Sequence, residues 1–493
     1  MTDVLSALQM VLVPLNLVGL VFGVLVGIAF GCMPGLSVNM GLALLFPLAF
    51  SFHGIGGILM LLGIYCGAIY GGSISAILLK TPGTPASVAT TLDGYPMATK
   101  MHQPGRALGL STMASTFGGV FSTICLILLA PQLAKVALQF SKPEYFALAI
   151  FGLSIITSVS SGSVLKGIMG GLLGLFLATV GIDDMSGTIR FTLDTTYFLG
   201  GVSFIPVLIG VFAFAQVLSS VETFYNQKHV EQKMTIDRVL PSMSDIKRVF
   251  STLVRSSCIG TFIGCVPGTG GDIAAFVSYD QAKRWSKHSD NFGNGEPEGI
   301  VASEAGNNSV SGGAFIPVLT LGIPGDGATA IMMGALMVQG LQPGPLLFTE
   351  KAADVYAIFI GLLLANIVMG IMGFSLIKLF VKVVSVPVHI LIPIICMMTF
   401  VGTYSYNNSM NDVYLMVFSG FVGYFLNKLG FSMSAVIIGI ILGGMAEQNF
   451  VGSLIMSDGS FGIFFTRPLC LFFLAAAALS LLSPVLGKLF KKA

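Results

Sequence analysis

Four Pro-Gly dipeptides with polar neighbours are the positions in this sequence whose residue types are suited to binding ions. They are Pro34-Gly35, Pro82-Gly83, Pro267-Gly268 and Pro324-Gly325. Proline removes one helical hydrogen bond and glycine tolerates backbone angles that open a helix, so we expect each dipeptide to interrupt a helix. A helix that restarts after a break presents free N–H groups, which suit a carboxylate, whereas an unwound helix end presents carbonyl oxygens, which suit Na⁺. The pattern therefore favours a site for an organic anion and a cation.

The polar residues beside these breaks are the candidate binding residues. Hydroxyl and amide groups at this density would be costly against lipid, so we expect them to face a hydrated cavity. The expected substrate-binding residues are Pro34, Gly35, Ser37, Asn39, Ser73, Ser75, Lys80, Thr81, Pro82, Gly83, Thr84, Pro267, Gly268, Thr269, Asn307, Asn308, Pro324, Gly325 and Asp326. The candidates for ion coupling, at which any bound Na⁺ is also expected, are Asp272, Glu304, Asn307, Asn308 and Thr320.

Three charged residues near the breaks each have two interpretations. Lys80 is the one cationic side chain beside the breaks, so it either pairs with a substrate carboxylate or lies at the membrane interface with its ammonium group in water. Asp272 and Glu304 either carry a coupling proton or help to hold Na⁺, or they pair with a structural partner such as Arg284. The sequence leaves these alternatives open.

Other chemistries that short motifs suggest are excluded by their context. The run PGTGGD, which ends at Asp272, lacks the GK[ST] of a phosphate-binding loop, which argues against ATP-driven transport. The run GGSIS, which begins at Gly71, lacks the closing glycine of a GxSxG nucleophile elbow. Asp272 and Asp280 are too close in sequence to form the two-helix dyad of an intramembrane protease. The seven cysteines contain no CxxC pair and have no neighbouring histidines, so we expect buried thiols rather than metal or redox sites. With these motifs rejected, we expect no enzyme activity and no cofactor other than the coupling ion.

The composition places the breaks in a membrane protein. Hydrophobic residues make up 54% and charged residues 9% of the 493 residues, and the mean hydropathy is +0.90, far from soluble globular values. About 20 apolar residues cross the hydrocarbon core, so the apolar stretches predict about 10 to 12 membrane spans. Long charge-free stretches include residues 4–79, 107–134, 195–221, 305–325, 355–377 and 383–411. The net charge of +2 gives no indication of nucleic acid binding.

The basic residues predict how the chain is oriented in the membrane. By the positive-inside rule, the long polar loop, the C-terminus and the segment around Lys100 and Arg106 should be cytoplasmic. The basic residues of the loop and the C-terminus are Lys228, Lys233, Arg238, Lys247, Arg248, Arg255, Lys488, Lys491 and Lys492. The first six residues contain no Lys or Arg, so we expect the N-terminus outside. The first apolar stretch lacks the basic start of a signal peptide and is expected to be a retained span.

Two motifs recur in the same order, which predicts an internal repeat. GIAFGCMPG, which begins at Gly27, matches GTFIGCVPG, which begins at Gly260, in every glycine, the cysteine and the proline. GGSISAILLKTPG from Gly71 resembles GGAFIPVLTLGIPG from Gly312, if one inserted residue is allowed. We therefore expect an all-α polytopic membrane protein with two homologous repeats, inverted in topology, with broken or re-entrant segments. The expected boundaries are residues 1–221 for the first repeat, 222–250 for a basic cytoplasmic loop and 251–493 for the second.

Several longer segments resemble the large membrane subunit of the tripartite tricarboxylate transporters. These segments, with the hydropathy of the remainder, cover nearly the whole chain: GCMPGLSVNMGLALLFPLAF, YGGSISAILLKTPGTPASVATTLDGYPMA, GCVPGTGGDIAAFVSYDQAKR, FGNGEPEGIVASEAGNNSVSGGAFIPVLTLGIPG and GLQPGPLLF. The resemblance implies a multi-pass protein of the bacterial inner membrane that works with a small four-span membrane subunit and a periplasmic solute-binding protein. Family members usually have Asn where this chain has Lys80, so either a bound anion here gains a positive partner or the substrate class is unusual.

The resemblance also implies the function and leaves one alternative class. The implied function is secondary active uptake of citrate or a related organic carboxylate, driven by a gradient of Na⁺ or H⁺. We expect alternating access of the elevator type, in which the site moves relative to a more static scaffold. The alternative is an anion channel or a membrane receptor that transports nothing, because channels also use broken helices. Paired polar breaks in two repeats favour the carrier.

Overall fold

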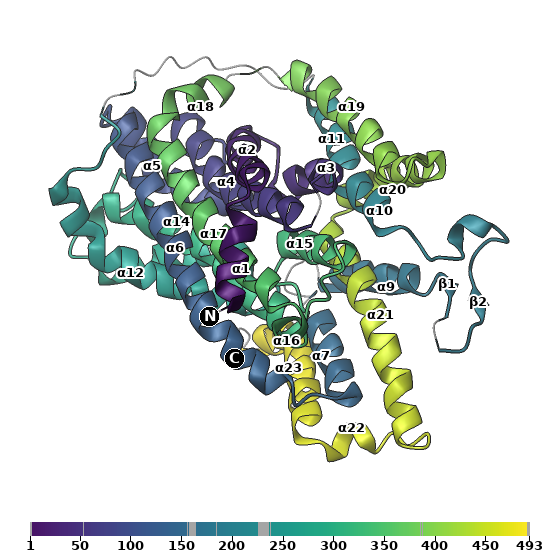
Figure 1. Cartoon of the computed structure of the whole chain (residues 1–493). Helices are drawn as coiled ribbons and strands as arrows, with labels where there is room; N and C mark the ends of the chain where they lie inside the picture. The colour runs from purple at the N-terminus through teal and green to yellow at the C-terminus, as the bar shows by residue number, and fades with distance from the viewer. Residues whose placement is uncertain are drawn as a thin grey trace.

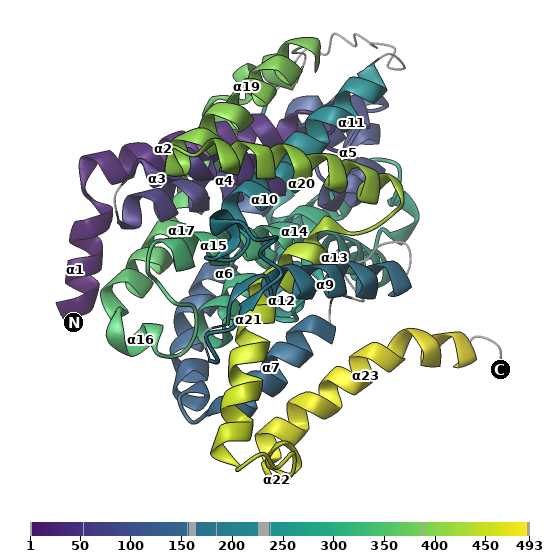
Figure 2. The ribbon, with the colours of Figure 1, turned by 90° about the vertical axis from the view of Figure 1, so that its right-hand side faces the viewer.

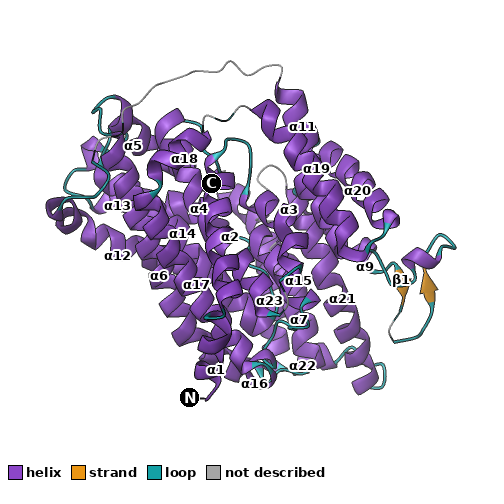
Figure 3. Cartoon of the chain, turned by 45° about the horizontal axis from the view of Figure 1, so that its top comes forward, coloured by secondary structure: helices purple, strands orange, loops and turns teal. Residues whose placement is uncertain are grey.

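The polypeptide folds almost entirely into helices in this computed structural model, as the sequence predicts (Figure 1). The structure describes residues 2–52, 54–154, 156, 164–183, 185–224, 236, 238–384, 386 and 388–490. Two short strands, β1 (Gly181–Ile182) and β2 (Ile189–Arg190), form an antiparallel hairpin that projects from the helical body (Figure 3). Most of the basic loop, with Lys228 and Lys233, and the terminal Lys491 and Lys492 lie outside the described residues.

The elements that precede the basic loop include the first two predicted breaks. They are α1 (Thr2–Val11), α2 (Pro14–Cys32), α3 (Val38–Phe50), α4 (Ile55–Leu79), the 3-10 turn η1 (Pro85–Ser87), α5 (Val88–Thr99), α6 (Pro104–Ala137), α7 (Lys142–Ser154), α9 (Val164–Ala178), the 3-10 turn η2 (Thr196–Phe198), α10 (Phe204–Ile209), the π-helical turn η3 (Gly210–Phe214) and α11 (Ala215–Phe224).

The elements that follow the loop include the other two breaks. They are α12 (Met243–Cys265), α13 (Gly270–Trp285), the 3-10 turn η4 (Ser289–Asn291), α14 (Pro297–Leu321), α15 (Gly327–Val338), α16 (Leu347–Glu350), α17 (Ala352–Ser375), α18 (Ile377–Val384), α19 (Val388–Asn407), α20 (Met410–Lys428), α21 (Met433–Met456), α22 (Ile463–Thr466) and α23 (Pro468–Phe490).

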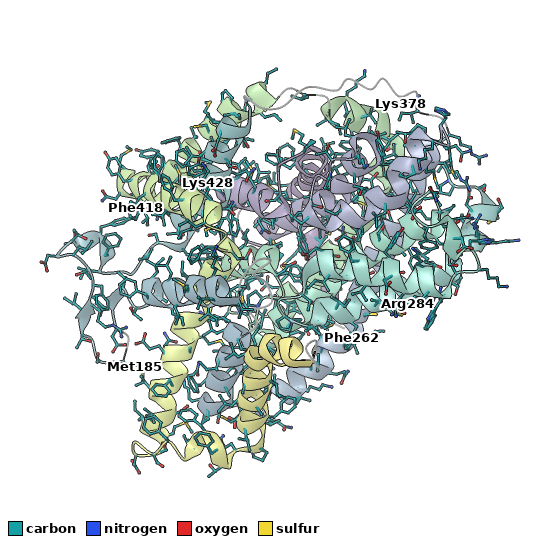
Figure 4. The ribbon with its side chains drawn as sticks, turned by 180° about the vertical axis from the view of Figure 1, so that it is seen from behind. Met185, Phe262, Arg284, Lys378, Phe418 and Lys428 are labelled. Atoms are coloured by element: carbon teal, nitrogen blue, oxygen red, sulfur yellow. The ribbon has the colours of Figure 1, made fainter. Side chains whose placement is uncertain are left out.

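Seven of the described helices are long and apolar enough to cross a membrane, which supports a multi-pass protein. These segments are Pro14–Cys32, Ile55–Leu79, Pro104–Ala137, Phe204–Glu222, Ala352–Ser375, Ile390–Asn407 and Met433–Met456, and four shorter apolar helices accompany them. Large apolar side chains cover the outside, among them Phe262 of α12 and Phe418 of α20 (Figure 4). Such an exterior suits lipid rather than water.

Two helices, α4 and α14, form the centre of the molecule. Their side chains are buried along almost the entire length of each helix. Helix α4 packs against α2, α3, α5 and α17, whereas α14 packs against α5, α6, α12 and α13 (Figure 2). A helix that is surrounded on all sides needs no polar face, and α4 is accordingly apolar all round.

The backbone contacts between α2 and α4 recur between α12 and α14. Side chains added at Gly27 and Gly31 would meet the backbone of α4 at Ile64 and Ala68. In the same way, side chains added at Gly260 and Gly264 would meet the backbone of α14 at Gly306 and Val310. Glycine lets both pairs of helices approach this closely.

These contacts define which positions of α4 and α14 correspond. Gly71 lies against the carbonyl oxygen of Ile28, and Gly313 lies against the carbonyl oxygen of Thr261. Gly71 stands at the same distance along the chain from Pro82 as Gly313 does from Pro324, so the correspondence needs no insertion. The alignment from sequence pairs Gly71 with Gly312, whereas the contacts pair Gly71 with Gly313. The two alignments therefore differ by one position at the start of this motif. The two-repeat organisation remains a prediction that these contacts support.

Polar contacts join the segments that the basic residues predict to be cytoplasmic. Arg106 at the start of α6 forms an ion pair of 2.5 Å with Asp245 in the first turn of α12. Arg248 of α12 forms a second ion pair, of 2.7 Å, with Glu296, which precedes α14. The two predicted cytoplasmic regions are therefore adjacent, which is consistent with their assignment to one side of the membrane.

A buried carboxylate fastens α5 to the chain before α14. Asp93 is fully buried and accepts four hydrogen bonds, each 2.8 Å long. The donors are the Tyr279 hydroxyl and the backbone N–H groups of Gly293, Gly295 and Glu296. Because these groups come from α13 and from the segment before α14, Asp93 links the first half of the chain to the second.

Candidate ion and carboxylate site at the helix breaks

Each of the four Pro-Gly dipeptides separates two helices, so the predicted helix breaks are confirmed. The first separates α2 from α3 and the third separates α12 from α13. At the second break, α4 ends at Lys80, which has a left-handed backbone (φ 58°), and η1 and α5 follow. At the fourth break, α14 ends at Gly322, which is also left-handed (φ 68°), and α15 follows. Both residues form the left-handed caps that commonly end helices.

The four breaks meet in pairs. The N–H of Gly268 at the third break donates a hydrogen bond of 2.5 Å to the carbonyl oxygen of Gly325 at the fourth. Gly83 at the second break packs so closely on the carbonyl oxygen of Gly31, just before the first break, that any side chain there would clash. These contacts unite residues that are far apart in the sequence.

Contacts also run between the first and second halves of the chain. Asn39 of α3 lies against Gly327 at the start of α15, which joins the first break to the fourth. Gly271 of α13 lies against Ala86 of η1, which joins the third break to the second. Each break therefore has a neighbour in its own half and another in the opposite half.

A polar cavity of about 300 Å³ lies beside the first break. Ser37 and Asn39 line it, together with groups that sequence analysis did not select: Gln216, Asn427, Ser432 and Ser434. Gln216 donates a hydrogen bond of 2.7 Å to the carbonyl oxygen of Gly35 and so fixes α11 to the break. The volume is at the lower limit of typical small-ligand sites.

Helix N-termini converge on this cavity. Ser37 precedes α3 and accepts a hydrogen bond of 3.2 Å from the N–H of Met40, whereas Ser432 precedes α21. Gly327, the first residue of α15, lies against Ser434 and Asn39. Helix N-termini carry partial positive charge and free N–H groups, so the cavity is suited to a negatively charged group.

The residues that sequence analysis missed in the cavity gave no usable signal. The breaks were found because they recur, but Gln216 and the segment from Asn427 to Ser434 have no counterpart in the repeated motifs. One structural indication is the π-helical turn η3, which directly precedes α11 and contributes Val211 and Phe212 to the cavity wall. Such turns often occur at functional sites.

Glu304 lies in a buried cluster of hydroxyl groups. Its carboxylate accepts hydrogen bonds from Thr90 of α5 and from Ser115 of α6, the latter 2.9 Å long. Asn308 donates to the Ser115 hydroxyl at 2.9 Å. Among the described residues, none of the ion pairs includes Glu304. The carboxylate is therefore held by neutral donors from the first half of the chain, one helical turn from Asn307.

Several other predicted site residues have local partners. The hydroxyl of Thr320 donates to the carbonyl oxygen of Ile316 in its own helix, at 2.7 Å. Ser73 and Ser75 are fully buried in α4 and donate to carbonyl oxygens of the preceding turn. These bonds satisfy the hydroxyl donors, although each oxygen keeps acceptor capacity.

The two hydroxyl groups of Thr84 and Thr269 also have local partners. Thr84 shares a hydrogen bond of 2.9 Å with Ser87 of η1. Thr269 donates to the carbonyl oxygen of Val266 at 2.7 Å, which closes the turn at the third break. Both residues therefore hold the shape of their breaks.

The charged residues at the breaks are arranged as follows. Lys80 is exposed, and its ammonium group lies 5.7 Å from the centre of the Tyr95 ring, a cation–π geometry. Asp272 is also exposed, in the first turn of α13. Arg284, which sequence analysis named as a possible partner of Asp272 or Glu304, instead pairs with Asp280 at 2.9 Å. Among the described residues, neither Asp272 nor Glu304 forms an ion pair with Arg284.

Comparison with known proteins identifies relatives over almost the entire chain. The model of the "Tripartite tricarboxylate transporter TctA family" matches residues 17–438. An "Uncharacterized 52.8 kDa protein in TAR-I ttuC' 3'region" of Agrobacterium vitis is 35% identical over 482 residues, which cover 96% of this chain and 95% of the relative. An "Uncharacterized protein in TAR-II ttuC' 3'region" of the same organism is 36% identical over 210 residues, 43% of this chain and 87% of the relative. No solved structure matches.

Proposed function

Because the chain belongs to the tripartite tricarboxylate transporter TctA family, we propose that it is the large membrane subunit of a secondary active uptake system. Its substrates would be tricarboxylates or related organic acids, and a gradient of Na⁺ or H⁺ would drive uptake. A periplasmic solute-binding protein would deliver the substrate, and a small four-span subunit would complete the complex in the bacterial inner membrane.

The observation that carries the proposal is the meeting of four helix breaks from both halves of the chain. Interrupted helices expose backbone N–H and carbonyl groups, which is tolerated in a membrane only where protein or a water-filled cavity satisfies them. Paired interruptions at corresponding positions of two halves are typical of the binding site of a secondary transporter. Channels also use broken helices, so the two classes are separated by experiment.

We place the substrate carboxylate in the polar cavity beside the first break. Support comes from Ser37, Asn39 and Ser434, which offer neutral donors, and from the N-termini of α3 and α21. Among the described residues, no Lys, Arg, Asp or Glu lines the cavity. Neutral donors and helix dipoles bind an anion without the strong desolvation cost of a buried ion pair, which suits a ligand that must also be released.

Alternating access of the elevator type is consistent with the contacts of α3 and α15. These short helices of the first and fourth breaks contact α19 and α21 respectively, which lie outside the central group of α2, α4, α12 and α14. Labelling of cysteine variants at Thr84 and Thr329 would measure how accessible the second and fourth breaks are in the two states of the transporter. An elevator moves both positions relative to residues of α17, whereas unchanged labelling in both states contradicts it.

The function can be tested with the reconstituted complex. The chain, its small subunit and its binding protein would be placed in liposomes, and uptake of labelled citrate and other organic acids would be measured with and without Na⁺ and pH gradients. Counterflow separates the two candidate classes, because a carrier shows saturable exchange and a channel does not. Absence of saturable uptake of every carboxylate tested would contradict the proposal.

A further inference from the structure

We infer that Glu304 carries the coupling proton, and that the hydroxyl groups of Thr90 and Ser303 form a switch that serves both of its protonation states. This inference rests on the proposed cation-coupled transport, and it adds which cation binds at this place and which groups bind it. Sequence analysis left Glu304 open as a proton carrier, a Na⁺ ligand or a structural acid. It did not select Thr90 or Ser303.

Glu304 is a buried acid whose hydrogen-bond partners are all neutral. Its side chain is 0% exposed within α14. Both carboxyl oxygens are occupied, because Oε1 contacts the Thr90 hydroxyl and Oε2 accepts a hydrogen bond of 2.9 Å from Ser115. A buried carboxylate without a cationic partner is costly, and a bound proton removes its charge. The surroundings of Glu304 therefore favour proton binding.

The charged and titratable groups on α14 and the helices packed against it have other partners, are exposed, or form no bond with Glu304. Among the described residues, the partnered groups are Arg106 with Asp245, Arg248 with Glu296, Arg284 with Asp280, Asp93 with Tyr279, Tyr70 with Thr112, Arg255 with Trp285 and Lys80 with Tyr95. The exposed ones are Lys135, Lys247, Asp272 and Lys283. The groups that form no hydrogen bond or ion pair with Glu304 in the described part of the chain also include Tyr65, Cys66, Cys125, Cys258, Cys265 and Glu298.

The hydroxyl of Thr90 has two possible acceptors and a single hydrogen. Its oxygen lies within hydrogen-bond distance of Glu304 Oε1 and, at 3.2 Å, of the Ser303 oxygen. The Ser303 hydroxyl has acceptors of its own, the carbonyl oxygens of Gly299 and Ile300 at 2.9 and 3.0 Å. The Ser303 oxygen is therefore able to accept a bond, and Thr90 can donate in either direction.

These contacts fit both protonation states of Glu304. When Glu304 is charged, Thr90 and Ser115 both donate to the carboxylate. When a proton is on Oε1, the carboxyl O–H donates to the Thr90 oxygen and the Thr90 hydroxyl turns to Ser303. Binding of the proton thus requires the rotation of one hydroxyl group, and no buried donor loses its acceptor in either state. A structural carboxylate would need Thr90 only as a donor.

The close packing around Glu304 suits a proton better than a metal ion. Helix α6 approaches α14 so closely that a side chain at Gly118 would meet the carbonyl oxygen of Ala305, the residue after Glu304, at 2.6 Å. Ser115 is itself held by Asn308, whose amide donates to its oxygen at 2.9 Å. The carboxyl oxygens already contact hydroxyl groups directly, whereas a hard metal ion must lie between its oxygen ligands.

Thr90 connects the proton site to the helix breaks. It lies in the first turn of α5, which follows the second break and η1. Gly83 of that break packs on the carbonyl oxygen of Gly31, just before the first break and its polar cavity. A change of charge at Glu304 therefore acts on a helix that begins near the proposed substrate site, where proton and substrate must be coupled.

Protonation of Glu304 can be measured in the purified full chain, without transport. Infrared difference spectra between weakly acidic and alkaline pH should show the band of a protonated carboxyl group, in a range where exposed carboxyl groups stay charged. The area of this band should fall in Glu304→Gln and stay unchanged in Glu350→Gln, in which an exposed acid is replaced. An unchanged band in Glu304→Gln would overturn the inference.

Transport in the reconstituted complex tests whether this proton is the coupling ion. Glutamine resembles the protonated acid, because its amide N–H can donate to Thr90 and its oxygen can accept from Ser115. Accumulation requires the proton to leave Glu304 to water on the inner side, whereas exchange of external for internal substrate does not. Glu304→Gln should therefore lose accumulation driven by a pH gradient and retain counterflow. Wild-type accumulation by this variant would overturn the inference.

Variants of Thr90 separate the hydroxyl switch from packing. Thr90→Ser keeps the hydroxyl and should behave as the wild type. Thr90→Val keeps the volume but removes the hydroxyl, so pH-driven accumulation should fall about tenfold, the equivalent of one hydrogen bond to a charged group, while counterflow persists. Thr91→Val is the matched control, because the Thr91 hydroxyl donates to the carbonyl oxygen of Val88 at 2.6 Å. Equal effects of Thr90→Val and Thr91→Val would overturn the switch.

The outcomes for function and for the proton site are distinguishable. Carboxylate uptake that a Na⁺ gradient drives and a pH gradient does not would overturn the proton site and leave the transport function intact. Protonation of Glu304 with the expected variant pattern, in a protein that exchanges no carboxylate, would support the site and contradict the proposed function.

Discussion

The two central helices, α4 and α14, share their packing but differ in chemistry. Both pack through glycines onto a preceding helix, with Gly31 against Ala68 in one pair and Gly264 against Val310 in the other. Yet the middle of α4 is almost wholly apolar, whereas the middle of α14 carries an acid, amides and hydroxyls. The polar residues of this part of α14 are Glu304, Asn307, Asn308, Ser309 and Ser311.

This difference shows that the glycine packing shared by α4 and α14 does not require the polar residues of α14. Glycine contacts align both helix pairs, so the polar side chains of α14 are additions that neighbouring helices must accommodate. They are accommodated by hydroxyl groups of α5 and α6, such as Thr90 and Ser115, which bind Glu304. The corresponding position of α4 is Leu62, which is as far from its Pro-Gly break as Glu304 is from its own. The polar side chains are therefore concentrated on α14, one of two helices with similar packing.

The largest effect should follow from breaking the shared packing. Gly31→Val places a side chain against the backbone of Ala68, and Gly264→Val places one 2.9 Å from the carbonyl oxygen of Val310. Backbone atoms cannot move aside as a flexible side chain can, so both variants should yield little monodisperse protein on size-exclusion chromatography in detergent. Gly444→Val is the control, because its position in α21 has open space around it. Normal yield of both core variants would contradict the shared packing.

The next largest effect should come from making α14 resemble α4. Glu304→Leu copies Leu62 into α14 and leaves the hydroxyls of Thr90 and Ser115 without their acceptor, at about 1 to 3 kcal/mol for each group that stays unpaired. We expect reduced thermal stability and no detectable uptake.

Glu304→Gln keeps an acceptor and should fold, but uptake should fall about tenfold or more if the carboxyl takes part in coupling. Wild-type uptake by Glu304→Gln would limit Glu304 to a structural role, and exposed Glu350→Gln serves as the control.

A smaller effect is expected at the contact that joins the two halves. Asp93→Ala would leave the Tyr279 hydroxyl and three backbone N–H groups without their acceptor, which should cost about 3 kcal/mol of stability. The residue that corresponds to Asp93 in α15 is Ala335, so no second contact of this kind would compensate. Thermal unfolding measures the loss, and Asp290→Ala, an exposed acid nearby, should change little. Equal melting temperatures of the two variants would contradict the role of Asp93.

Sequence analysis succeeded where a residue type restricts the backbone directly. Pro-Gly dipeptides cannot continue a regular helix, and for that reason all four breaks lie where the sequence predicts them. It did not find the role of Asp93, because four donors from distant segments meet there only after folding. It also gave no indication that the Tyr65 hydroxyl would be buried without a hydrogen-bond partner, since a tyrosine in an apolar helix has the composition of an ordinary core residue.

The elements of the cavity show the same limit. Ser37 and Asn39 stand beside a recurring motif, whereas Gln216 and Ser434 come from helices outside the repeated segments. Thr320 stays a candidate for ion binding, because its hydroxyl donates to Ile316 in its own helix while its oxygen keeps acceptor capacity. Proximity along the chain predicts which backbone is interrupted, and it does not predict where a side chain points.

The smallest and most discriminating change concerns Lys80, which ends α4 as Gly322 ends α14. Both residues have left-handed backbones, and both stand just before the Pro-Gly dipeptide, separated from its proline by a single residue. Glycine adopts this conformation without the steric cost that lysine pays, so Lys80→Gly should stabilise the protein by about 1 kcal/mol or slightly less. Lys80→Ala removes the same ammonium group but keeps the steric cost. If Lys80 pairs with a substrate carboxylate, both variants should raise the substrate KM similarly, although only Lys80→Gly gains stability. If both retain wild-type KM and rate, the side chain is only a helix cap above Tyr95, and α4 contributes no charged group to the site at all.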